Sequence, residues 1–78
     1  MTRDLSVVGC TGIITVATRG ADGMGEVLIS YRGGSEALLA WSDTPLPKGT
    51  NVLVIEVRGP RTVHVVRADD LGARSPFT

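Results

Sequence analysis

The sequence has very few cysteine and aromatic residues, and this scarcity excludes several kinds of protein. Its 78 residues include one cysteine, Cys10, so no disulfide can form within the chain. Tryptophan, tyrosine and phenylalanine occur once each, whereas strand surfaces that bind single-stranded nucleic acid stack bases on several aromatic rings. The 8 basic residues are balanced by 8 acidic ones, although phosphate binding favours an excess of positive charge. Nucleic-acid binding is therefore not expected. A nucleic-acid-binding OB-fold module that uses Arg58, Arg61 and Arg67 remains the alternative.

Long apolar runs and helical periodicity are also absent. No apolar run approaches the roughly 20 residues that a bilayer-spanning helix needs, so we expect the chain itself to be soluble and not to insert into a membrane. No window repeats apolar residues at i, i+3, i+4 and i+7, which is the pattern of an amphipathic helix. The 42% hydrophobic content, together with 10 glycines and 4 prolines, predicts one small all-β domain with many tight turns.

Residues 23–42 are the centre of the predicted domain, because two apolar runs flank Gly33-Gly34. This dipeptide suits a two-residue hairpin turn, since glycine adopts the positive φ angles that such turns require. A turn at this position places Ile29 opposite Leu38. Side chains alternate between the two faces of a strand, and one face then carries four apolar residues: Val27, Ile29, Leu38 and Ala40.

The other face of this hairpin is the predicted contact surface. Leu28, Leu39 and Trp41 lie on it beside Glu26, and Tyr31 lies near the turn. Tryptophan buries a large area at low entropic cost and is common at the centre of interfaces. The competing interpretation is that Trp41 plugs the core or one end of a barrel. We predict protein-contact residues at Leu28, Tyr31, Leu39 and Trp41.

Three further strands are predicted, at residues 13–18, 51–58 and 61–67, with Ile14, Val16 and Thr18 of the first pointing inward. Five short strands separated by glycine and proline turns predict an all-β, helix-poor, OB-like barrel. An SH3-like barrel and a small sandwich remain alternatives. The organisation expected is a lead-in segment at residues 1–8, the barrel at residues 9–68 and a disordered tail at residues 69–78.

No constellation of residues indicates catalysis, a cofactor or a metal. His64 is the only histidine and lacks the neighbouring ligands that a metal site needs, so we predict that it faces solvent on its strand. Cys10 is expected to be a packed thiol. Ser42-Asp43 is interpreted as a strand end followed by a turn, because the sequence places no histidine beside it. The chain is therefore not expected to be an enzyme.

The order of glycine turns and valine-rich strands resembles the C-terminal domain of NfeD-like proteins, a small helix-poor OB barrel. The resemblance covers residues 9–66. It rests, in chain order, on Gly9, Gly12, Gly25, Val27, Ile29, Ala40, Ser42, Gly49, Thr50, Val52, Val54, Val57, Gly59, Val63 and Val65.

This resemblance implies a function that composition and spacing do not. Similar domains are the soluble, non-catalytic parts of membrane-anchored proteins, and they act with stomatin- or flotillin-type (SPFH) partners. The resemblance thus implies an interaction or assembly module on the cytoplasmic side of a membrane. A homo-oligomer is a second form of assembly compatible with it.

Overall fold

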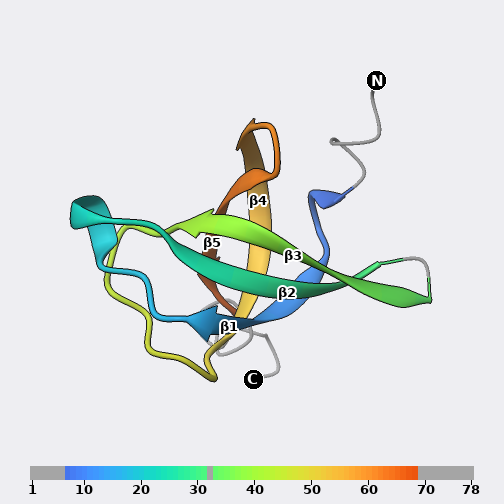
Figure 1. Ribbon diagram of the computed structural model, residues 1–78, viewed down its shortest axis with the longest axis horizontal. Coiled ribbons are helices and arrows are strands. Elements are labelled where there is room, and N and C mark those ends of the chain that lie inside the picture. The colour runs from blue at the N-terminus through green and yellow to red at the C-terminus, as the bar shows by residue number, and fades with distance from the viewer. Residues whose placement is uncertain (1–6, 32, 69–78) are drawn as a thin grey trace, which may run out of the picture.

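The computed structural model describes residues 7–31 and 33–68, with the Tyr31 side chain excepted (Figure 1). Five strands close into a barrel in the order β1-β2-β3-β5-β4. Neighbouring strands are antiparallel except for β3 and β5, which are parallel. This architecture confirms the predicted all-β, OB-like barrel. The elements are β1 (Thr11–Val16), the 3-10 turn η2 (Gly20–Asp22), β2 (Gly25–Tyr31), β3 (Gly34–Trp41), β4 (Asn51–Gly59) and β5 (Thr62–Arg67).

The core lies between the β2–β3 hairpin and the strands that cross behind it (Figure 1). The four apolar residues predicted to share one face of the hairpin are all buried, with exposed fractions from 0% to 6%. Val63 and Val65 of β5 point into the same core. Val7 is also buried in it, so the packed core includes a residue of the segment predicted as a lead-in. The predicted tail at 69–78 lies outside the described residues.

The hairpin turns one residue earlier than predicted. Tyr31 is paired with Gly34, and Val27 rather than Ile29 lies opposite Leu38. Gly33 has a φ angle of 83°, whereas Gly34 belongs to β3. The prediction of a Gly33-Gly34 turn was therefore wrong. Moving the turn by one residue changes each cross-strand partner by two positions, so every side chain keeps its predicted face.

A bulge in β1 reverses the predicted direction of Val16. Ile14 is paired with Val27, but Val16 is paired with the adjacent Glu26, so one residue of β1 is unmatched. As a result, Val16 is 51% exposed instead of buried. Gly25 permits this arrangement, because a Cβ atom there would lie 2.1 Å from the carbonyl oxygen of Val16.

The connector between β3 and β4 contains no helix and folds back onto the core. Its Leu46 is only 2% exposed, and its backbone N–H donates to the Thr18 hydroxyl at 2.9 Å. The Ser42 hydroxyl donates to the Thr44 carbonyl at 2.6 Å. Since this bond uses the only hydroxyl proton of Ser42, the Thr18 hydroxyl donates to Ser42, at 2.5 Å. This one-directional chain of hydrogen bonds fastens the connector to the end of β1.

Candidate functional site on the outer face of the barrel

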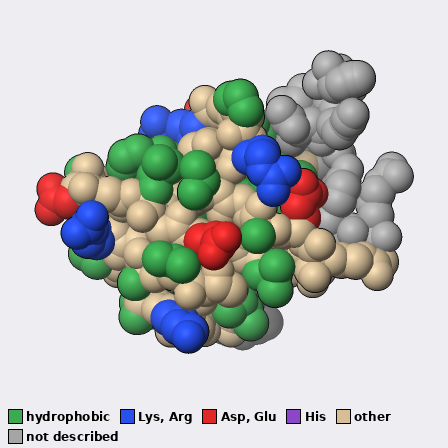
Figure 2. Space-filling view, in the orientation of Figure 1, with side chains coloured by type: hydrophobic (Ala, Val, Ile, Leu, Met, Phe, Trp, Pro, Cys, Tyr) green, Lys and Arg blue, Asp and Glu red, His purple; other side chains and the backbone are tan. Residues whose placement is uncertain are grey.

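The outer surface of β1, β2 and β3 carries a group of exposed apolar side chains. Figure 2 shows hydrophobic side chains gathered over β2 and β3, with an acidic side chain among them. We define the outer apolar face as the four residues that share this surface, each between 41% and 51% exposed: Ile13, Val16, Leu28 and Leu39.

Strand pairing brings the members of the outer apolar face together. Ile13 of β1 is the direct cross-strand partner of Leu28 in β2. Glu26 lies between the other two members, since it is paired with Val16 on one side and with Leu39 on the other. Directly opposed side chains on one face of a sheet are close enough to contact each other. The four apolar residues therefore form two adjacent rows across three strands.

The structure assembles two of the four predicted contact residues. Leu28 and Leu39 lie on the outer apolar face. The side chain of Tyr31 lies outside the described part of the chain. Trp41 is half-buried, and its cross-strand partner in β5 is His64. The contact residues were predicted from the hairpin alone. Ile13 was therefore missed, although strand alternation places it on the outside. Val16 was missed because alternation without the bulge places it inside.

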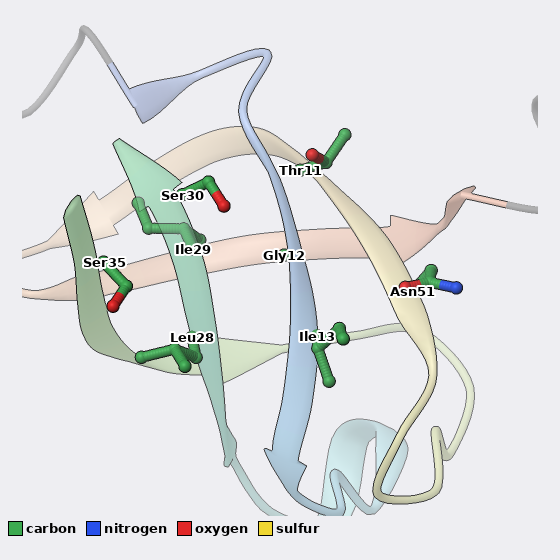
Figure 3. A pocket seen from close by; sticks show the side chains of 8 residues that line it. All are labelled: Thr11, Gly12, Ile13, Leu28, Ile29, Ser30, Ser35 and Asn51. Atoms are coloured by element: carbon green, nitrogen blue, oxygen red, sulfur yellow. The ribbon is translucent and has the colours of Figure 1, made fainter. Parts of the chain in front are cut away.

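A shallow hollow of about 290 Å³ adjoins this face (Figure 3). The strand β1 crosses it at Gly12, with Ile13 and Leu28 on one side of that glycine and Thr11 and Ser30 on the other. A Cβ atom on Gly12 would lie 2.6 Å from the carbonyl oxygen of Leu28, so only glycine allows the strands this close approach. The described residues that line it contribute hydroxyl, amide and apolar groups but no ionisable side chain. It suits contact with a partner better than acid–base chemistry.

A second group of residues surrounds His64 and brings four ionisable side chains together: Asp43, Glu56, Arg58 and His64 itself. The His64 side chain is only 12% exposed, so the prediction that it faces solvent was wrong. Its Nδ1 lies 3.3 Å from a guanidinium nitrogen of Arg58, and its Nε2 lies 3.3 Å from Oδ1 of Asp43. The contact with Asp43 lacks hydrogen-bond geometry, so Nε2 has no hydrogen-bond partner among the described residues. One of these neighbours, Arg58, comes from the adjacent strand β4, and the other, Asp43, comes from the connector after β3.

The structure thus places a serine, an aspartate and a histidine around one small pocket, which is lined by Ser42, Asp43 and His64 together with Trp41, Arg58 and Ala21. A nucleophilic serine needs its hydroxyl bonded to the histidine that removes its proton. The Ser42 hydroxyl instead donates to a backbone carbonyl and accepts from Thr18. Ser42 is also only 5% exposed. Its hydroxyl therefore has a structural role in holding the connector.

Two other features of the described residues bear on function. No group of three or more histidine, cysteine, aspartate or glutamate side chains in that part of the chain is arranged to hold a metal ion. A search of the same residues for a helix long and apolar enough to cross a membrane finds none. Cys10 packs against the core.

Comparison with known proteins agrees with the fold described above. The family model for the NfeD C-terminal domain matches residues 11–66. The solution structure of the soluble domain of the NfeD protein YuaF from Bacillus subtilis is similar, with a TM-score of 0.72 and 30% sequence identity. The match covers 83% of this chain and 77% of that one. No curated protein sequence matches. With most of its barrel matched, the chain belongs to the NfeD family and contains the NfeD C-terminal domain.

Proposed function

We propose that this chain is the protein-interaction domain of a membrane-anchored NfeD protein, that it catalyses no reaction itself, and that it binds an SPFH-type partner from the cytoplasmic side. The observation that carries the proposal is the outer apolar face. Its four side chains are about half exposed on three adjacent strands, whereas the apolar side chains on the opposite face of the same strands are buried in the core. Contiguous apolar groups on a surface commonly mark a binding site.

The arrangement of polar groups supports a binding role over a catalytic one. In the pocket beside His64, the Ser42 hydroxyl is committed to the connector. Among the described residues that line the hollow beside Gly12, none has an ionisable side chain. The outer apolar face, in contrast, has side chains whose exposed part leaves water only when another molecule covers it, and this burial favours binding.

The nucleic-acid alternative receives less support from the arginines than the sequence suggested. Arg58 lies 3.8 Å from a carboxylate oxygen of Glu56, and Arg61 lies 3.7 Å from one of Glu36. Arg61 also donates to the carbonyl oxygen of Ala37 at 3.1 Å. Two of the three arginines that carried this alternative thus have partners in the domain itself.

The proposal is tested by measuring binding to the soluble domain of an SPFH-type protein from the same genome. The variant is Leu28→Ser combined with Leu39→Ser. We expect it to bind at least about tenfold more weakly, because each substitution loses roughly half of the 1.5–3 kcal/mol that full burial of a leucine side chain provides. The matched control is Ile55→Ser, because Ile55 of β4 is as exposed as Leu39, at 44%, and lies outside the outer apolar face.

The outcomes separate three explanations. Loss of binding in the double variant alone supports the proposed surface. Equal loss in Ile55→Ser would mean that general exposure of apolar groups, and not this surface, drives association. No binding by the wild-type chain would contradict the SPFH partner, and self-association lost in the double variant would then indicate a second copy of the chain.

A further inference from the structure

Glu26 is an anomaly on the outer apolar face. It is paired across the sheet with Val16 and with Leu39, and Leu28 lies two residues further along the same side of β2. These three neighbours are 41% to 51% exposed. A carboxylate thus occupies the middle of the apolar surface.

The carboxylate of Glu26 is held in position from one side. The Thr15 hydroxyl lies 3.2 Å from Oε1 of Glu26 and 3.3 Å from its backbone oxygen. Thr15 is at the bulge of β1, so the same irregularity that turns Val16 outward also brings a hydroxyl to Glu26. A hydroxyl has a single proton to donate, and the carboxylate therefore keeps most of its capacity to accept hydrogen bonds.

Glu26 also has no positively charged partner among residues 7–31 and 33–68. Ion pairs between described residues involve Glu36, Glu56 and Asp43, and Glu26 takes part in none of them. Glu26 is half-buried, so water still hydrates its side chain. When a partner covers the surrounding apolar side chains, this water is displaced, and a buried charge without a counter-charge opposes binding.

We infer that the outer apolar face recognises a partner segment in which a lysine or arginine lies between apolar side chains, with the cation paired to Glu26. A basic group at that position compensates the lost hydration of the carboxylate and fixes the register of the partner. The apolar neighbours on the segment cover Val16, Leu28 and Leu39. This inference rests on the proposed function for the surface and adds the chemistry of the partner.

The test uses small amphiphiles that present one charge on an apolar tail. Octylammonium and octyl sulfate are titrated separately, below their critical micelle concentrations, into the isotopically labelled 78-residue chain, and backbone amide shifts of β2 and β3 are followed by NMR. We expect octylammonium to bind this face at least about threefold more tightly than octyl sulfate, a ratio typical of one exposed charge pair. Glu26→Gln is expected to abolish the preference. Asp22→Asn, which removes an exposed carboxylate of η2, is the matched control and is expected to retain it.

Equal affinities for the two amphiphiles, or a preference that survives in Glu26→Gln, would overturn the inference. A second measurement distinguishes it from the proposed function. If Leu28→Ser with Leu39→Ser abolishes binding of the SPFH-type protein while Glu26→Lys binds it as the wild type does, the interaction surface is right and the cationic partner is wrong. If the SPFH-type protein does not bind but the octylammonium preference is present and depends on Glu26, the partner's identity is wrong and its chemistry is right.

Discussion

The two faces of the β2–β3 hairpin carry similar residues and have opposite environments. Ile29 on the inner face is fully buried, whereas its neighbour Leu28 on the outer face is 41% exposed. Strand geometry alone sends the two side chains in opposite directions. The rest of the chain closes around the inner face, and within the described residues nothing covers the outer one to the same degree. The contrast separates apolar residues that serve folding from those that remain for contact with another molecule.

The largest expected difference between the faces is in stability. Ile29→Ala removes a fully buried side chain, and such truncations cost about 2–5 kcal/mol because they lose burial and leave a cavity. Leu28→Ala is expected to cost less than about 1 kcal/mol, since its side chain is already partly hydrated. Urea unfolding followed by Trp41 fluorescence measures both. Equal losses would mean that the outer face is part of the core and is not a free contact surface.

Gly25 offers a second test, because it makes the bulge in β1 possible. A Cβ atom at this position would be 2.1 Å from one backbone oxygen, so Gly25→Ala is expected to destabilise the domain by about 1–3 kcal/mol or more through forced backbone shifts. The control is Gly59→Ala, where an added Cβ meets nothing within 4 Å. Thermal unfolding of the two variants is compared. A stable Gly25→Ala variant would contradict the close approach of the strands.

The hydroxyl chain that anchors the connector predicts a smaller effect. Thr18→Val preserves the shape of the side chain but leaves the Leu46 N–H without its acceptor, which typically costs about 1–3 kcal/mol for a buried donor. Thr62→Val is the control, since the Thr62 hydroxyl bonds the Pro60 carbonyl at an exposed position. The free energy of unfolding in urea gives both values. If the two substitutions have the same effect, the hydroxyl chain does not stabilise the connector.

The smallest effect is expected at the ion pairs. Arg58→Ala removes a side chain that is 47% exposed and whose guanidinium lies 3.8 Å from Glu56. Exposed pairs of this kind contribute about 0–1 kcal/mol, so unfolding of the variant should stay close to that of the wild type. A loss comparable to that of Ile29→Ala would show that the polar group around His64 is a major source of stability, and the contrast between the two faces would then be incomplete.

Local patterns in the sequence were sufficient to predict the barrel and the two faces of its hairpin. Glycine and proline mark the turns, and apolar alternation marks the strands. The position of the turn was predicted wrongly, because the sequence does not distinguish Gly33 from Gly34 as the turn residue. The two faces were still predicted correctly, because side chains change face only when the register moves by an odd number of positions.

The remaining features depend on contacts between different segments of the chain. The exposure of Val16 results from a bulge formed against Gly25, which lies on another strand. His64 is covered because the fold brings Asp43 and Arg58 to it from two other segments. Leu46 lies between two prolines and has no periodic pattern around it, so its burial follows only from the way the connector folds back.

The most direct test of the outer apolar face as the binding surface is an NMR footprint of the labelled chain with the SPFH-type soluble domain. If this face binds, the largest changes in amide shift or intensity occur at residues 13–16, 26–28 and 37–39, with little change at residues 55–58. A footprint centred on residues 55–58, or on the pocket beside His64, would contradict the assignment of the binding surface.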